Sequence, residues 1–108
     1  MVSYALFLDD ERFPDQLDSK IPLIDWKIAR NYFDAVWMIE NIGMPYHISF
    51  DHDLGSPSNP TGMDFAKYLG NFIMDRNLKV DFSYYVHSMN PVGAKNIQSY
   101  MDQLKRDL

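Results

Sequence analysis

Apolar and polar residues alternate along the chain in blocks that predict short strands separated by helices. Four apolar runs, at residues 2–8, 26–29, 47–50 and 82–86, have the length and composition of β-strands. The first run is apolar at almost every position, which is typical of a strand buried on both faces of a parallel sheet. The polar stretch after it, residues 9–25, contains Pro14 and Pro22, which argue against a long regular helix there.

The segment after the second strand predicts a helix over residues 32–42. Asn31 is placed to cap its N-terminus, because an asparagine side chain accepts a hydrogen bond from the first free N–H groups of a helix. The predicted buried face consists of Phe33, Val36 and Trp37, which recur at helical spacing.

Two further helices are predicted after the third and fourth strands. Thr61 followed by Asp64 resembles a capping box, and the apolar stripe behind it consists of Phe65, Leu69, Phe72 and Ile73. Asn90 followed by Pro91 is typical of a cap and a first helical residue. The buried stripe of this last helix is predicted to be Ala94, Ile97, Met101 and Leu104.

Strands that alternate with helices predict an α/β fold with a parallel sheet and right-handed crossovers. Ligands of such sheets bind beyond the carboxyl ends of the strands. Chemically unusual residues follow three of the four predicted strands. They are Asp9, Asp10, Glu11 and Arg12 after the first, Asp51, His52 and Asp53 after the third, and His87 and Ser88 after the fourth. We therefore expect one site at this edge of the sheet.

The aspartates of this set predict a metal site. Carboxylates gathered at one edge repel one another unless a cation or a proton intervenes, and carboxylate oxygens are ligands that Mg²⁺ and Mn²⁺ accept. The candidate ligands are Asp9, Asp10, Asp51 and Asp53. The alternative is that these side chains only cap turns and helices after their strands.

The candidate catalytic residues are His52 and His87. Imidazole titrates near neutral pH, so one histidine would accept a proton from water or a hydroxyl while the other donates to a leaving oxygen. The alternative is a structural, hydrogen-bonded role for each of them.

Four further residues are candidates for binding a phosphate ester. Arg12 offers a guanidinium fork, and Ser88 offers a hydroxyl donor. Asn90 and Gly93 lie at the start of the last helix, where free N–H groups attract anions. The alternatives are that Arg12 neutralises the neighbouring aspartates and that Asn90 is a simple cap.

Composition limits the class of partner. The chain has 108 residues, a net charge of −5 and no cysteine, which predicts one domain over residues 1–108 and a cytoplasmic protein without disulfides. Its acidity disfavours broad electrostatic binding of DNA, although it permits a nucleotide or an RNA end at a local site. No apolar run approaches the length of a membrane span.

The polar residues also carry a resemblance to receiver domains of two-component signalling. Asp9 and Asp10 match the metal-binding acid pair of receivers, Asp51 the phosphoacceptor position and Ser88 the hydroxyl position. The resemblance implies a small receiver-like (flavodoxin-like) three-layer sandwich, with a four-stranded parallel sheet in the order 2-1-3-4. Receivers have a fifth strand that ends in a lysine, and no such strand follows the last predicted helix.

A closer resemblance is to the cyclic-phosphate processing receiver domains. The segments LFLDDERFP, ISFDHDLG, TGMDFA and VHSMNPVGAKNI are similar to the pattern of that family, in order and across nearly the whole chain. The resemblance implies a hydrolase, associated with RNA repair, that processes 2′,3′-cyclic phosphates at RNA ends or in small nucleotides. It implies a divalent metal on Asp9, Asp10 and Asp51, with proton transfer by His52 and His87.

Two other functions stay open. The first is a catalytically inactive receiver that serves as a protein-binding module and forms a homodimer through an open sheet edge, because unpaired strand edges recruit partners. The second is a phosphoacceptor switch at Asp51.

Overall fold

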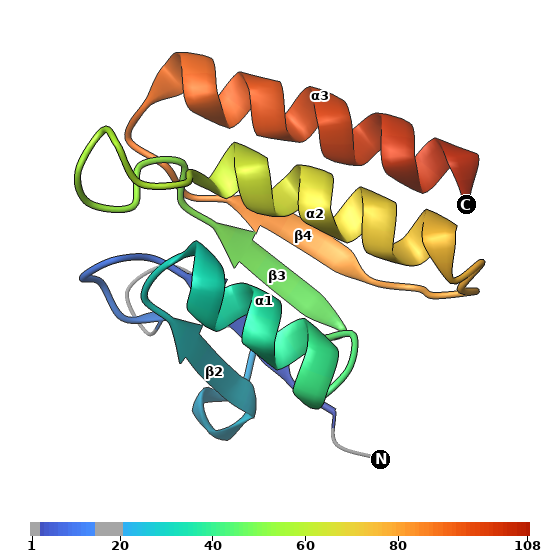
Figure 1. Cartoon of the computed structure of the whole chain (residues 1–108). Coiled ribbons are helices and arrows are strands. Elements are labelled where there is room, and N and C mark those ends of the chain that lie inside the picture. Colours follow the sequence, from blue (N-terminus) through green and yellow to red (C-terminus); the bar gives the residue numbers. More distant parts are fainter. Residues whose placement is uncertain (1–2, 15–20) are drawn as a thin grey trace.

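The computed structural model describes residues 3–14 and 21–108 (Figure 1). It contains these elements in chain order: β1 (Ala5–Leu8), η2 (Leu23–Asp25), β2 (Trp26–Ala29), α1 (Tyr32–Asn41), β3 (His47–Phe50), α2 (Gly62–Asp75), β4 (Ser83–Val86) and α3 (Pro91–Asp107). The first and fourth strands therefore begin at Ala5 and Ser83, later than predicted. None of the helices formed by the described residues is long and apolar enough to cross a membrane.

The four strands form one parallel sheet in the order β2-β1-β3-β4. Leu8 at the end of β1 is in register with Ala29 of β2 and with Phe50 of β3, and Phe50 is in register with Val86 of β4. All four strands therefore end at the same level. The predicted α/β fold and strand order are confirmed.

The three α-helices lie side by side over one face of this sheet (Figure 1). α2 contacts both α1 and α3, as expected for right-handed crossovers on one side of neighbouring strands. A third layer on the opposite face would have to come from the predicted helix-free stretch 9–25. Residues 15–20 of this stretch lie outside the described part of the chain.

The main core lies between the sheet and the helices. Leu6, Leu8, Ile48 and Phe50 face it from the two central strands, and each is fully buried. α2 and α3 contribute the stripes predicted for them, with Phe65, Leu69, Ile73, Ile97, Met101 and Leu104 buried. Phe72 and Ala94 complete these stripes as partly buried residues.

The predicted buried face of α1 is wrong at two of its three positions. Phe33 and Trp37 are 66% and 59% exposed, whereas the buried residues of this helix are Ala35 and Ile39. Small Ala35 allows α1 to pack closely on the sheet, and Val36 lies at the border of the contact. Apolar residues surround most of this helix, so helical spacing alone fits either stripe.

The helix N-termini are capped as predicted. The Asn31 side chain accepts a hydrogen bond from the Asp34 N–H at 2.8 Å, and Thr61 and Asp64 form a complete capping box. The Asn90 side chain accepts from the Gly93 N–H at 3.0 Å. Such caps each stabilise a helix by about 1 kcal/mol, and they fix where α2 and α3 begin relative to the strand ends.

Candidate functional site

Three buried polar residues continue β1, β3 and β4 by one position each. Asp9, Asp51 and His87 donate their backbone N–H groups to the last residues of neighbouring strands, at distances of 2.9–3.1 Å. Side chains alternate between the two faces of a strand. These three therefore project on the face of Phe7 and Ser49, away from the helices. One potential ligand atom from each of the three lies within 4.8 Å of the others.

Asp9 is the most extensively hydrogen-bonded carboxylate of the site. Its Oδ1 accepts the backbone N–H groups of Glu11 and Arg12 at 2.9 and 2.8 Å. Its Oδ2 accepts from Arg12 Nε at 2.8 Å and lies 2.9 Å from His87 Nε2. Burial opposes ionisation of Asp9, but these donors together hold its pKa below the ordinary value. Asp9 is therefore ionised at neutral pH.

His87 is buried and is bonded through both ring nitrogens. Its side chain reaches across β3, stacks on Phe7 with ring centroids 4.7 Å apart, and places Nδ1 2.7 Å from Ser49 Oγ. Burial lowers the pKa of His87, and the Asp9 carboxylate only partly opposes this effect. The network fits the neutral tautomer in which Nε2–H donates to Asp9 and Nδ1 accepts from Ser49. Neither nitrogen is free to exchange a proton with a substrate.

The pKa of Asp51 is shifted in the opposite direction from that of Asp9. Burial and the nearby Asp9 carboxylate raise its pKa, and the Ser88 hydroxyl and the Arg12 guanidinium only partly offset them. Arg12 Nη2 lies 3.6 Å from Asp51 Oδ2, so the same guanidinium contacts both carboxylates. Arg30 holds this loop in place through a 2.7 Å hydrogen bond to the Arg12 carbonyl.

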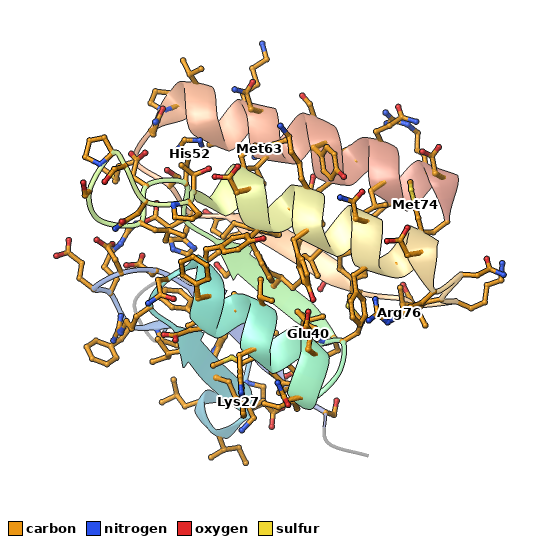
Figure 2. The ribbon with its side chains drawn as sticks, viewed as in Figure 1. Lys27, Glu40, His52, Met63, Met74 and Arg76 are labelled. Carbon is orange, nitrogen blue, oxygen red and sulfur yellow. The ribbon has the colours of Figure 1, made fainter. Side chains whose placement is uncertain are left out.

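His52 follows Asp51 and projects to the other side of the sheet edge. Its ring packs against the first turn of α3, where a Cβ on Gly93 would lie 2.4 Å from His52 Cγ. Figure 2 shows His52 at the end of the molecule where α2 and α3 begin. Its Nδ1 lies 2.9 Å from Asp53 Oδ1, and this hydrogen bond lowers the pKa of Asp53. Donation from Nδ1 leaves the lone pair on Nε2.

The edge thus brings together some predicted site residues and separates others. Asp9, Asp51 and His87 meet in one buried group, whereas His52 is bonded to Asp53 outside that group, so the two histidines do not form a facing pair. The Ser88 hydroxyl accepts from the Asn90 N–H at 3.1 Å as well as bonding Asp51. The Gly93 N–H, predicted to be open to an anion, is bonded to Asn90.

Sequence reasoning missed two residues that shape this edge. Ser49 is a polar residue inside an apolar strand, and that departure from the pattern was its only signal. Gly62 lies so close to β3 that an added Cβ would meet the Asp51 carbonyl oxygen at 1.9 Å. The Gly62 N–H also donates to the His52 carbonyl at 2.8 Å. The start of α2 therefore holds the Asp51–His52 peptide, which no local pattern indicates.

A pocket of about 480 Å³ opens at this edge. It is lined by Asp10, Glu11, Arg12, Asp51, Asp53, Gly55 and Met89. Asp10 and Asp53, predicted as metal ligands, thus line the pocket beside Asp51 but lie outside the buried group of three. The lining carries four carboxylates and one guanidinium, so an anionic ligand requires a further positive charge there.

The buried group fits a divalent cation in ligand type. Mn²⁺ accepts two carboxylates and an imidazole as ligands, and Mg²⁺ accepts the carboxylates. His87 would join them only in its other neutral tautomer, in which Nδ1–H donates to Ser49 Oγ and Nε2 carries a lone pair instead of the proton donated to Asp9. The Arg12 guanidinium already lies between the two carboxylates. A cation that enters this group therefore exchanges with Arg12 at Asp51.

Comparison with models of protein families identifies the family of this chain. The model of the cyclic-phosphate processing receiver domain matches residues 4–103, which is nearly the whole sequence. The chain belongs to this family. The resemblance inferred from the four sequence motifs is confirmed.

The structure is also similar to a solved structure. The latter is described as the yeast Spc42 trimeric coiled-coil, amino acids 181–211, fused to another structure, and it matches with a TM-score of 0.54 at 18% identity. The match covers 93% of this chain and 65% of that chain, so the present chain spans less than two thirds of the fusion. This likeness concerns the fold alone. Comparison with curated proteins finds no match.

Proposed function

We propose that this receiver-like domain hydrolyses 2′,3′-cyclic phosphates of nucleotides or RNA ends. The observation that carries the proposal is a pocket lined by Arg12, Asp51 and Asp53, the last of which is hydrogen-bonded to His52. The family description, cyclic-phosphate processing, supports the substrate class. This reaction requires a group that binds the phosphate and an oriented base close to it.

The reaction replaces one bond to phosphorus by another. Water forms a new P–O bond and loses a proton, while the bond from phosphorus to one ribose oxygen breaks and that oxygen gains a proton. Attack and departure take place on opposite sides of phosphorus in an in-line displacement. One histidine therefore serves one of the two proton transfers, and solvent water in the open pocket serves the other.

His52 is the residue to which we assign proton transfer. Asp53 accepts from its Nδ1 at 2.9 Å, which fixes the ring and leaves Nε2 as the base, as in other carboxylate–histidine pairs. Gly93 permits the ring to lie against α3. His87 instead has a positioning role. It is bonded to Asp9 Oδ2, and the same oxygen accepts from Arg12, so His87 helps to orient both the carboxylate and the guanidinium.

The acidic pocket also bears on the cofactor. When bound, Mg²⁺ or Mn²⁺ would supply the positive charge that neutralises the phosphate. Asp9 and Asp51 are the residues that would hold it, joined by His87 only in the tautomer that carries its proton on Nδ1. Asp10 and Asp53 add negative charge at the pocket wall. Arg12 released from Asp51 would be free to contact a phosphate oxygen.

The decisive experiment is hydrolysis of 2′,3′-cyclic AMP and of a cyclic-phosphate-ended RNA, with Mg²⁺ or Mn²⁺ and with chelator. We expect turnover that chelator removes and that His52→Ala lowers by about 10²-fold or more, the usual contribution of a general base. Asp75→Asn, an exposed change near the far end of α2, is the control and should keep full activity. Unchanged turnover in His52→Ala would refute the assigned mechanism.

A protein-binding module is the second candidate. It is favoured by one observation, namely that both ring nitrogens of His87 are bonded within the protein. β4 is an edge strand of the sheet, and Tyr85 on it is 49% exposed, so this edge is the predicted surface for a homodimer. A folded protein without turnover on either substrate, which elutes as a dimer in size-exclusion chromatography, would favour this function.

A further inference from the structure

Two exposed apolar side chains lie at or just before the start of α3, and the first of them lines the acidic pocket. Met89 lines the pocket and is 85% exposed, and Val92 in the first turn of α3 is 71% exposed. Neither belongs to the buried stripe of α3, which consists of Gly93, Ile97, Met101 and Leu104. These two exposed side chains therefore contribute little to the core, and their surfaces are accessible to a ligand.

The size of the pocket leaves room beyond a phosphate group. Its volume of about 480 Å³ lies within the range of sites for small organic ligands, roughly 300–1,000 Å³. A phosphate held near Arg12 and Asp51 fills only a part of this space. The remainder is bordered by Met89, whose flexible thioether makes favourable contacts with aromatic rings.

The charge of the pocket determines which part of a substrate can occupy the volume that the phosphate leaves. Four of its lining residues are carboxylates and one is a guanidinium. A second phosphate group, such as the next phosphate of an RNA chain, would be repelled there, whereas an uncharged ribose and base would not. The net charge of −5 acts in the same direction on a long nucleic acid.

We propose that the substrate is a mononucleotide 2′,3′-cyclic phosphate whose base packs on Met89, with Val92 extending the apolar surface. The proposal rests on the proposed function, because it places the reacting phosphate at Arg12 and Asp51. It adds that the enzyme acts on free nucleotides in preference to RNA ends. Met89 is then the residue that recognises the base.

The first test detects base contact without turnover. With ¹³C-methyl-labelled methionine, we expect adenosine 3′-monophosphate, in the presence of Mg²⁺, to move the Met89 methyl signal upfield through the ring current of the base. Ribose 5-phosphate should not do so. Met74, which is 57% exposed, is the internal control. Figure 2 shows it near the far end of α2, whereas Met63 and His52 lie at the end where α2 begins. Loss of one signal in Met89→Leu assigns the Met89 resonance.

The second test is kinetic. Met89→Ser should raise KM for 2′,3′-cyclic AMP by up to about tenfold, as expected when an aromatic base loses its contact with a thioether. Met74→Ser should leave KM unchanged. The wild-type enzyme should have a lower KM for 2′,3′-cyclic AMP than for a cyclic-phosphate-ended oligonucleotide.

The outcomes separate this inference from the proposed function. A shifted Met89 methyl in a protein without turnover would support base binding and refute hydrolysis. Turnover with an unmoved Met89 methyl and an unchanged KM in Met89→Ser would refute base packing and keep hydrolysis. A lower KM for the oligonucleotide would overturn the preference for mononucleotides.

Discussion

The two sides of the sheet edge use the same residue types in opposite ways. On the side away from the helices, His87 is buried, stacked on Phe7 and bonded to Ser49 and Asp9. On the helix side, one ring nitrogen of His52 is hydrogen-bonded to the exposed Asp53, and the ring packs against the start of α3. Both histidines directly follow strands and both have aspartate partners. Only their surroundings distinguish them.

The difference comes from strand alternation. Asp51 and His52 are consecutive, so they project to opposite faces at the end of β3, and His87 continues β4 on the face of Asp51. Where the face is closed, the histidine becomes part of the framework that orients a carboxylate. Where the face meets a loop and the start of a helix, the histidine has only one ring nitrogen bonded to its aspartate neighbour. An aspartate beside a histidine is therefore insufficient evidence for catalysis.

Removal of the His87 side chain is expected to have the largest effect on stability. His87→Ala leaves a cavity beside Phe7 and removes the hydrogen bonds that His87 makes to Asp9 and Ser49, and we expect a loss of about 3 kcal/mol in the free energy of unfolding. The measurement is urea denaturation followed by far-UV circular dichroism.

His52→Ala is the matched control for that measurement. It removes the same side chain at the same edge, but Asp53 is exposed and is solvated when its partner is lost. We expect it to cost about 1 kcal/mol or less. Equal losses in the two variants would contradict the distinction between a framework histidine and a catalytic one.

Gly93→Ala should affect the helix side alone, and by less. Alanine stabilises a helix by up to about 1 kcal/mol relative to glycine, but its Cβ would lie 2.4 Å from His52 Cγ and displace the ring. We expect hydrolysis of 2′,3′-cyclic AMP to fall about tenfold, as expected when a base is moved out of reach, while the protein stays folded.

Asn96→Ala provides the comparison for Gly93→Ala. Asn96 is exposed on the same helix, so this change also raises helix propensity but lies away from the His52 ring. Its activity should stay at the wild-type value. If Gly93→Ala also keeps full activity, the packing of His52 on α3 has no part in catalysis.

Much of the fold follows from the sequence because its signals are local. The caps at Asn31, Thr61 and Asn90 and the stripes of α2 and α3 all appear as patterns within a few residues. The strand order came from the resemblance to receiver domains. The face of α1 was assigned wrongly because its apolar residues surround most of the helix. Which of them is buried depends on how closely α1 approaches the sheet, a property of the tertiary fold.

The candidate site was less predictable, for a related reason. The rule for parallel sheets indicates the right edge, and it places Asp9, Asp51 and His87 there. It does not say which face of the edge each side chain occupies, nor that Arg12 contacts both carboxylates. Gly62 and Ser49 act only through neighbours that are distant in sequence. These features depend on register and packing.

The smallest expected effect is a pH dependence of stability, which tests the buried environment of His87 alone. Burial lowers the pKa of His87 below its ordinary value of 6.5, so its neutral form is favoured in the folded protein. This contribution to stability is complete above the unfolded pKa and is lost as the pH falls through the folded one. We expect Tm to decrease from pH 7 to pH 5, and to decrease less in His87→Gln.

The two aspartates act on the same curve with opposite signs. Asp9, whose pKa is lowered, stabilises the fold above its unfolded pKa and loses this contribution in acid. Asp51, whose pKa is raised, stabilises the fold in acid and loses that contribution as the pH rises through its folded value. Their effects oppose each other, and both aspartates are present in His87→Gln as well as in the wild type. A decrease in Tm between pH 7 and pH 5 that is as steep in His87→Gln as in the wild type would therefore show that His87 is not held in its neutral form.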